Sequence, residues 1–270
     1  MTAVASSLSR PLPEFPVDPT QKINKTLDFR DLQEPQVRAT ASEIKRWVWR
    51  WLLRGEPLGV NGRVKHRFYI RRHKMWEYAR GLALTNTSAR TRSDHRPLTV
   101  LDIGGAMTAP VFYLAGLRDS VVCLDIDRQL TDRTNKTAAR RQLRIDARTT
   151  NLVDDDPSAA DLGVGDGFDR VFCFCVIEHV LPPGQTVLAK RMAALVKPGG
   201  MLAMTFDFGE DAPSEAPLRT LERVDELRSA IDLPLMGYDA FVDTGSRHRL
   251  DRKFPDRRFT FGSMFFQRPQ

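Results

Sequence analysis

The sequence predicts an α/β protein built on a doubly wound parallel sheet, preceded by a basic helical extension. From residue 98 onward, short apolar runs suited to buried strands alternate with helical segments, which is the pattern of βαβ units. Before residue 98, apolar residues recur at helical spacing. With 270 residues, the chain is long enough to bury one large core and to carry an appendage.

The chain divides into three parts. Residues 1–35 are rich in proline, serine and polar residues without a sustained period, so we expect a flexible or loosely docked arm. Residues 36–97 are predicted to form a basic helical cap or lid, and residues 98–270 the α/β domain. The first helix should begin at the capping box Thr40–Glu43, bury a stripe that includes Ile44, Val48 and Trp51, and end at Gly55. A second helix is expected over residues 63–84.

Composition excludes several classes of protein. Hydrophobic residues make up 41% of the chain and charged residues 28%, as in ordinary globular proteins. No uninterrupted apolar stretch reaches about 18 residues, and the first residues lack an apolar core flanked by positive charge, so we expect neither a membrane span nor a secretory signal. The three cysteines lie inside apolar runs without zinc-site spacing, which predicts reduced thiols, a cytoplasmic protein and no metal centre.

Positive charge is concentrated in the helical extension. Residues 36–97 hold 15 Lys and Arg against four Asp and Glu, within a chain whose net charge is +7. Such a block, with Trp47, Trp49, Trp51, Phe68 and Tyr69 among its cations, is suited to single-stranded RNA. A solvated helix surface that docks on the main domain through its apolar stripe explains the same pattern.

The segment from Leu98 to Pro110 predicts a ligand site. An apolar strand over residues 98–103 breaks at Gly104 and Gly105, and Pro110 suits the first turn of a helix. A strand, a glycine turn and a helix start allow bare backbone to approach a ligand. The second strand, Ser120–Asp125, ends in an acid that can accept hydrogen bonds from ribose hydroxyls. The alternative is that Asp125 or Asp127 only caps the following helix.

Further strands and turns follow in a regular order. The third strand is expected over residues 142–145 and the fourth over residues 168–174, which leads into Cys175-Val176-Ile177-Glu178-His179. A helix over residues 184–196 precedes the turn Lys197-Pro198-Gly199-Gly200 and a fifth strand over residues 201–206. Near the C-terminus, residues 238–242 and 259–267 are predicted to pair as antiparallel strands.

From residue 98 to residue 267, the chain resembles the class I S-adenosylmethionine-dependent methyltransferases, of the methyltransferase type 11 kind. Four marks occur in the expected order: the Leu-Asp-Ile-Gly-Gly turn, the acid Asp125, the Phe-Asp-Arg-Val strand followed by Ile-Glu-His-Val, and the Lys-Pro-Gly-Gly turn. The resemblance implies a seven-stranded Rossmann-like sheet whose last strand is antiparallel. It also implies an enzyme whose cofactor, S-adenosylmethionine, lies across the carboxyl ends of the first, second and fourth strands.

The resemblance also assigns site residues. Cofactor-binding positions would be Asp102, Gly104, Gly105, Ala106, Asp125, Ile126, Asp146, Ala147, Cys175 and Val176. Among them, Asp125 would hold the ribose, Asp146 with Ala147 would face the adenine, and Cys175 with Val176 would line the sulfonium side. The family's turn is acid-x-Gly-x-Gly-x-Gly, whereas Ala106 and Thr108 replace the later two glycines here, which puts the cofactor pose in question.

These assignments lead to one functional prediction and two alternatives. The predicted function is methyl transfer to a small-molecule acceptor, at a hydroxyl of a sugar or secondary metabolite. A hydroxyl is helped by a general base, and the candidates are His179 and Asp207. One alternative is a nucleic-acid methyltransferase that uses the basic block. The other is a protein that keeps the fold without catalysis.

Overall fold

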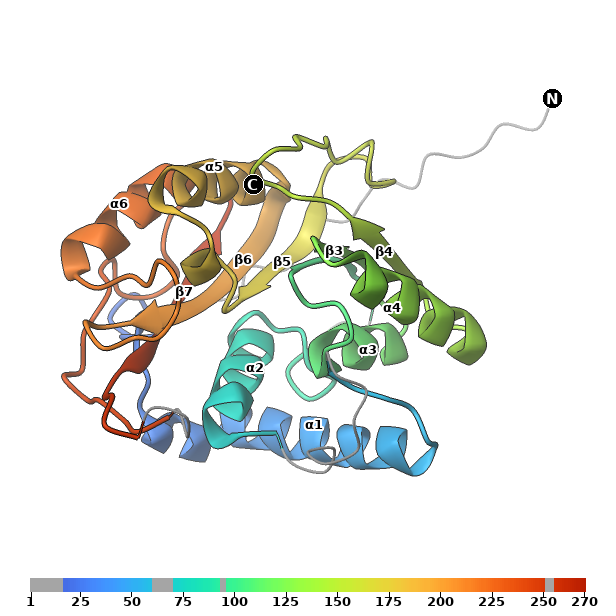
Figure 1. Ribbon diagram of the computed structural model, residues 1–270, viewed down its shortest axis with the longest axis horizontal. Coiled ribbons are helices and arrows are strands. Elements are labelled where there is room, and N and C mark those ends of the chain that lie inside the picture. Colours follow the sequence, from blue (N-terminus) through green and yellow to red (C-terminus); the bar gives the residue numbers. More distant parts are fainter. Residues whose placement is uncertain (1–16, 60–69, 93–95, 251–254) are drawn as a thin grey trace.

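The computed structural model describes residues 17–59, 70–92, 96–250 and 255–270, and shows a seven-stranded sheet with helices on both faces (Figure 1). The strand order is β1-β7-β6-β5-β2-β3-β4. Strands β2 to β6 run parallel to one another. Strand β7 lies between β6 and β1 and is antiparallel to both. The predicted fold, including the antiparallel last strand, is confirmed.

The parallel strands carry the apolar runs seen in the sequence. Their bounds are β2 Thr99–Ile103, β3 Ser120–Asp125, β4 Ile145–Thr149, β5 Phe168–Phe174 and β6 Val196–Phe208, and the antiparallel strands are β1 Lys25–Thr26 and β7 Thr260–Gln267. Strands β2, β3 and β5 are buried on both faces, so 12 of their 18 residues are apolar. Their predicted positions are confirmed to within one residue.

Helices cover the two faces of the sheet unequally. Helices α5 (Pro182–Ala194) and α6 (Leu221–Ile231) pack on one face. The other face carries α1 (Pro35–Leu53), α2 (Arg72–Leu84), α3 (Ala109–Gly116) and α4 (Arg128–Arg141). Helix α1 docks on α3 through stacked rings. The ring centroid of Trp51 lies 4.9 Å from that of Phe112 in α3 and 4.9 Å from that of Trp47 in α1 itself. No helix in the described part of the chain is long and apolar enough to cross a membrane.

The described part of the predicted arm is built into the domain, so the prediction of a flexible segment is wrong from about residue 23. Strand β1 pairs with β7, and the buried amide of Asn24 donates to the Met236 carbonyl at 2.8 Å and accepts from the Phe265 N–H at 2.9 Å. A 3₁₀ helix, Phe29–Gln33, places the buried Asp31 against α2. Residues 1–16 lie outside the described part of the chain.

Asp31 joins the N-terminal segment to α2. Its carboxylate accepts hydrogen bonds from Lys25 Nζ at 2.7 Å, Trp76 Nε1 at 2.8 Å and Arg80 Nη1 at 3.0 Å. Because Arg80 and Asp31 are both almost completely buried, each charge depends on the other for its compensation. Local composition could not predict this link, because its partners are about 45 residues apart.

Several predicted boundaries are wrong for identifiable reasons. Helix α1 starts at Pro35, whose fixed φ suits a first helical position, so Thr40 lies inside the helix and its hydroxyl hydrogen-bonds to Ser88 Oγ at 2.9 Å. Gln142 adopts φ +54° and ends α4, so β4 begins only at Ile145. Residues 238–242 form no strand, because β6 and β1 occupy the two edges of β7, and Val242 makes only a single bridge, to Lys25. The first half of the second predicted helix, with the Asn61-Gly62 turn, lies outside the described residues.

Candidate functional site

A cavity of about 480 Å³ opens at the carboxyl ends of the parallel strands. Five segments supply its walls: the end of β2, the end of β3, the residues that follow β4, the residues that follow β5 and the first half of α5. The lining residues include Ile103, Gly104, Asp125, Ile126, Asn151, Leu152, Val176 and His179. Strand order reverses at β2, and doubly wound sheets bind their ligands at such a reversal.

The glycine turn after β2 leaves no room for side chains. Gly104 has φ +69°, and a Cβ there would lie 2.5 Å from Val176 Cγ2. A Cβ on Gly105 would lie 1.7 Å from Asp102 Oδ1, so a side chain there would displace the Asp102 carboxylate. Asp102 is buried, and burial together with the charge of Asp125 raises the pKa of its carboxyl. Its Oδ1 has no hydrogen-bond partner among the described residues.

The two replaced glycines are compatible with this turn. Ala106 does not have a positive φ, so it needs no glycine; the left-handed residue is Met107, at φ +64°. The Thr108 hydroxyl donates to the Gly105 carbonyl at 2.7 Å and so tightens the turn. The departure from the family pattern therefore leaves the backbone cradle in place.

Asp125 lies at the cavity and is held by backbone donors. Its Oδ2 accepts from the Ala106 N–H at 3.2 Å and its Oδ1 from the Asp127 N–H at 3.0 Å. Burial raises the pKa of this carboxyl above its ordinary value. Helix α4 is capped by Asp127, which accepts from the Gln129 and Leu130 N–H groups. The capping alternative therefore applies to Asp127, and Asp125 keeps its free lone pairs toward the cavity.

Two predicted adenine contacts do not reach the cavity. Because β4 runs to Thr149, Asp146 and Ala147 lie in the middle of the strand, and Asp146 is exposed and ion-paired with Arg148 at 2.7 Å. The residues at the strand's carboxyl end are Thr150, Asn151 and Leu152, which line the cavity in their place. The assignment of Asp146 and Ala147 to the adenine is wrong because the strand was predicted to end at residue 145, whereas β4 ends at Thr149.

Cys175 and Val176 face different directions. Val176 lines the cavity. Cys175 adopts φ +54°, and its thiol donates to Glu77 Oε2 at 2.9 Å, toward α2. Glu77 is fully buried and also accepts from Lys74 Nζ at 3.1 Å and from the Thr205 hydroxyl at 3.0 Å. Helix α2 therefore extends the site beyond the cavity, over the ends of β5 and β6.

The two predicted catalytic residues have opposite environments. The His179 side chain is 56% exposed at the cavity rim, and its Nδ1 lies 2.5 Å from Glu215 Oε2. Asp207 is 8% exposed and lies within β6 rather than after it. Burial raises the pKa of Asp207 to about 6, which makes it a carboxylate of unusual basicity near neutral pH.

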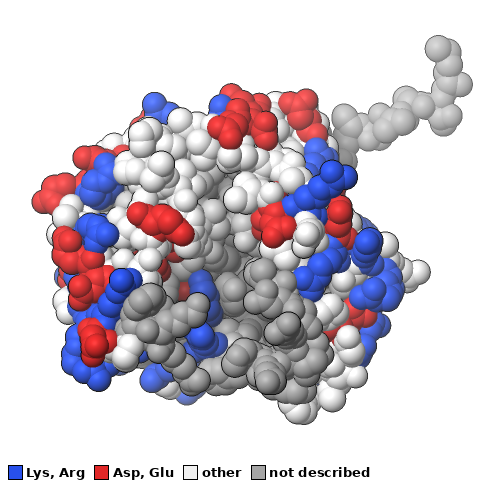
Figure 2. All heavy atoms as spheres, in the orientation of Figure 1, with Lys and Arg blue, Asp and Glu red and all other residues white. Residues whose placement is uncertain are grey.

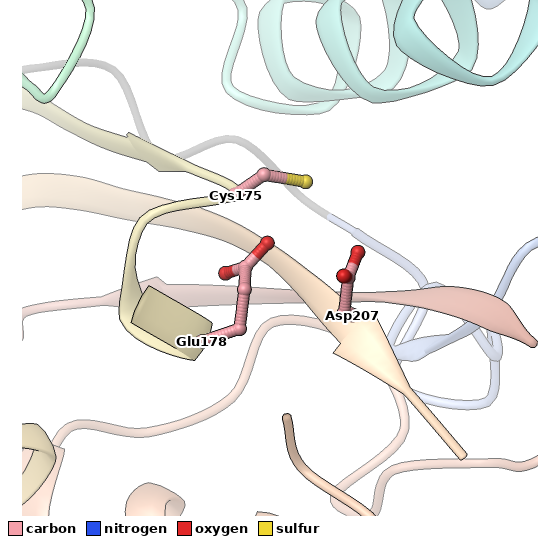
Figure 3. Close-up of side chains that lie close together, drawn as sticks. All are labelled: Cys175, Glu178 and Asp207. Atoms are coloured by element: carbon pink, nitrogen blue, oxygen red, sulfur yellow. The ribbon is translucent and has the colours of Figure 1, made fainter. Parts of the chain in front are cut away.

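Asp207 belongs to a compact group of polar side chains, hereafter the acidic cluster: Cys175, Glu178 and Asp207 (Figure 3). One ligating atom from each residue lies within 4.8 Å of the others. Sequence reasoning did not assign Glu178, although it stands in the quoted Ile-Glu-His-Val motif. It also did not assign Lys74 and Glu77, whose only sequence signal is an opposite-charge pair at helical spacing.

Comparison with known proteins identifies the domain. Residues 101–202, from β2 into β6, match the family model described as a methyltransferase domain. The chain carries a methyltransferase domain. It is of the class I kind, an enzyme class whose cofactor is S-adenosylmethionine. The site fits this cofactor, because Gly104 and Asp125 line a ligand-sized cavity at the expected strand ends. The Asp102 Oδ1 atom beside Gly105 has no hydrogen-bond partner among the described residues.

Solved structures agree on the fold of this methyltransferase. TehB from Haemophilus influenzae superposes with a TM-score of 0.50 at 17% identity, covering 64% of this chain. This chain spans 58% of the TehB chain. A candidate sarcosine dimethylglycine methyltransferase from Galdieria sulphuraria gives a TM-score of 0.52 at 13% identity, covering 84% of this chain and 98% of its own. YcgJ from Bacillus subtilis gives 0.51 at 11% identity, covering 70% and 98%. No curated protein matches the chain.

Proposed function

We propose that this methyltransferase transfers the methyl group of S-adenosylmethionine to a hydroxyl of a small molecule, such as a sugar or a secondary metabolite. The observation that supports this proposal is Asp207, a buried carboxylate with a pKa of about 6 at the end of β6. An uncharged amine or a thiolate can attack without help, whereas a hydroxyl benefits from a base with such a pKa. Asp207 lies beside Cys175. Cys175 directly precedes Val176, which lines the cavity.

The cofactor would be held by groups at the strand ends. Asp125 would accept hydrogen bonds from the ribose hydroxyls, and Asn151 with Leu152 would flank the adenine in place of Asp146 and Ala147. Gly104 and Gly105 would let the backbone approach the methionine part, and Asp102 would orient the turn or act through water. Bound S-adenosylmethionine supplies an activated methyl group on a sulfonium, which is an excellent leaving group.

The chain's own residues would align the acceptor and take its proton. The Asp207 carboxylate would accept the proton of the acceptor's hydroxyl as that oxygen receives the methyl group that the bound cofactor would supply. Helix α2 covers the ends of β5 and β6 with the pair Lys74 and Glu77, which excludes water from the acidic cluster. An acceptor enclosed in this way is small.

The test has two stages. Calorimetry should detect binding of S-adenosylhomocysteine and no binding of NAD. Methyl-tritiated S-adenosylmethionine is then offered with separate panels of sugars, phenols, small amines including sarcosine, and bulk RNA. We expect label in a hydroxyl panel, and loss of at least about tenfold in turnover in Asp207→Asn with cofactor affinity unchanged. Label only in amines or RNA, or full turnover in Asp207→Asn, would refute the hydroxyl proposal.

A further inference from the structure

Glu178 is a buried acid to which the proposed reaction gives no role. It is 1% exposed, and its Oε2 has no hydrogen-bond partner among the described residues. Its carboxyl group points toward Asp207 and Cys175, within the 4.8 Å limit of the acidic cluster (Figure 3). A buried carboxylate oxygen without a donor is costly, so its presence in a well-packed core calls for a chemical reason.

The backbone fixes this orientation. The chain turns sharply at Cys175, with φ +54°, and the Cys175 N–H donates to the Thr205 carbonyl at 3.0 Å. The Glu178 carbonyl accepts from the Ala216 N–H at 2.8 Å. These bonds tie the 3₁₀ helix Ile177–His179 to β6 and to the segment after it, so Glu178 points inward while the next residue, His179, is exposed.

The surrounding charges do not neutralise both acids. The titratable groups that face Glu178 and Asp207 are Lys74 and Glu77 from α2, Cys173 and Cys175 from the end of β5, and His179. The ammonium of Lys74 already pairs with Glu77 at 3.1 Å, and His179 pairs with Glu215. Two carboxyl groups this close in a buried site resist losing both protons, because the second charge must form beside the first.

We propose that Glu178 is a positioning residue that shares one proton with Asp207, so that the pair carries a single negative charge until the acceptor's proton arrives. This inference rests on the proposed function. After methyl transfer the pair holds two protons, and one leaves to solvent before the next cycle. Burial, with the charge of Asp207, raises the pKa of Glu178 to about 8, while that of Asp207 is about 6, which agrees with one retained proton between these pH values.

Carbon-13 NMR of protein labelled at Asp and Glu carboxyl groups tests the pair without an acceptor. In the wild type, titration from pH 4 to pH 10 should give midpoints of about 6 and about 8 for these two groups. In Asp207→Asn, the Glu178 midpoint should fall by at least about one pH unit, because the neighbouring charge is gone. In Glu178→Gln, only the step near pH 6 should remain. The exposed control Glu215→Gln should leave both midpoints unchanged.

The shared proton would be refuted if the titration midpoint of Glu178 did not change in Asp207→Asn. It would also be refuted if both carboxyl groups titrated in the ordinary carboxyl range in the wild type. Tight binding of Zn²⁺ or Mn²⁺ by the wild type that Asp207→Asn abolishes would refute it as well, since a cation and not a proton would then join the two groups. Failure of S-adenosylhomocysteine to bind would instead refute the proposed function. The two carboxyl midpoints are measured in the absence of cofactor, so the two failures are distinguishable.

Discussion

At the scale of single residues, cofactor affinity should depend strongly on Asp125. Asp125→Ala removes a buried acceptor for the ribose hydroxyls, which should weaken binding of S-adenosylhomocysteine by about 1–3 kcal/mol, or roughly 5- to 150-fold. Calorimetric titration measures this loss. The matched control is Asp127→Ala in the same loop, which removes the cap of α4 and should lower stability by about 1 kcal/mol while leaving affinity nearly unchanged. Equal affinities in wild type and Asp125→Ala would remove the ribose assignment.

Asp169 should make the protein sensitive to acid. Although burial opposes it, hydrogen bonding to Lys197, the Thr99 N–H and Arg96 lowers the pKa of Asp169 to about 2. Because the pKa of Asp169 is lower in the folded protein than its ordinary value of 3.8, the ionised carboxylate stabilises the fold. This contribution is complete above about pH 4 and is lost as the pH falls toward 2. Asp169→Asn should therefore be less stable than wild type by about 2 kcal/mol at pH 7, with a difference that shrinks below pH 4. Urea unfolding at pH 7, 4 and 3 measures this; a constant difference would contradict it.

Which site residues the sequence could predict depends on whether their signal is local. Gly104 and Asp125 stand next to strand ends that the apolar pattern marks, and both line the cavity. Glu77 lies about 100 residues from its partner Cys175, so only the folded chain brings them together. His179 was as close to the strand end as Glu178, but the direction of each side chain depends on the turn at Cys175, which no local pattern encodes.

At the scale of elements, the N-terminal segment should contribute strongly to stability. Asp31→Ala leaves Arg80 buried without its carboxylate, which should cost about 3–5 kcal/mol. Asp28→Ala is the control, since this nearby acid pairs with a highly exposed Arg30, and its effect should stay near 1 kcal/mol. Urea denaturation of the two variants beside wild type gives both values. Similar costs for both would mean that the link between this segment and α2 adds nothing.

The predicted helical cap is more deeply integrated than the sequence indicated. Helix α2 buries Met75, Trp76 and Ala79, and its Gly81 lies so close to Phe174 of β5 that a Cβ would fall 2.4 Å from the ring. Strands β2, β3 and β5 were predictable because both their faces are buried. Strand β4 was not, because an edge strand with the sequence Ile-Asp-Ala-Arg-Thr has too little apolar pattern to mark its ends.

At the scale of the whole molecule, the positive block of residues 36–97 is partly neutralised by acids, most of them from elsewhere in the chain. Arg92 pairs with Asp119, Arg96 with Asp169 and Arg80 with Asp31, and Lys74 pairs with Glu77 inside the block. Lys and Arg are interspersed with Asp and Glu over the face seen in Figure 2. Trp47 and Trp51, counted among the aromatic residues suited to RNA, pack on α3 instead.

We therefore expect little affinity for RNA. Filter binding with a generic single-stranded RNA at 50 mM and 200 mM salt should give weak retention at both concentrations. A protein that neutralises many phosphates would instead lose about a thousandfold in affinity over that range, because released counterions drive its binding. Tight retention with such a salt dependence would favour the nucleic-acid methyltransferase that the sequence left open.

Strand β1 has a consequence for how the protein is made. It leaves the ribosome long before its partner β7, because the Ser263 hydroxyl hydrogen-bonds to a carbonyl 238 residues earlier in the chain. During synthesis β1 and one edge of β6 stay unpaired until β7 emerges, and closing so long a loop is slow. Exposed strand edges invite association with other chains, so a stalled or shortened product should be a chaperone client rather than a partly active enzyme.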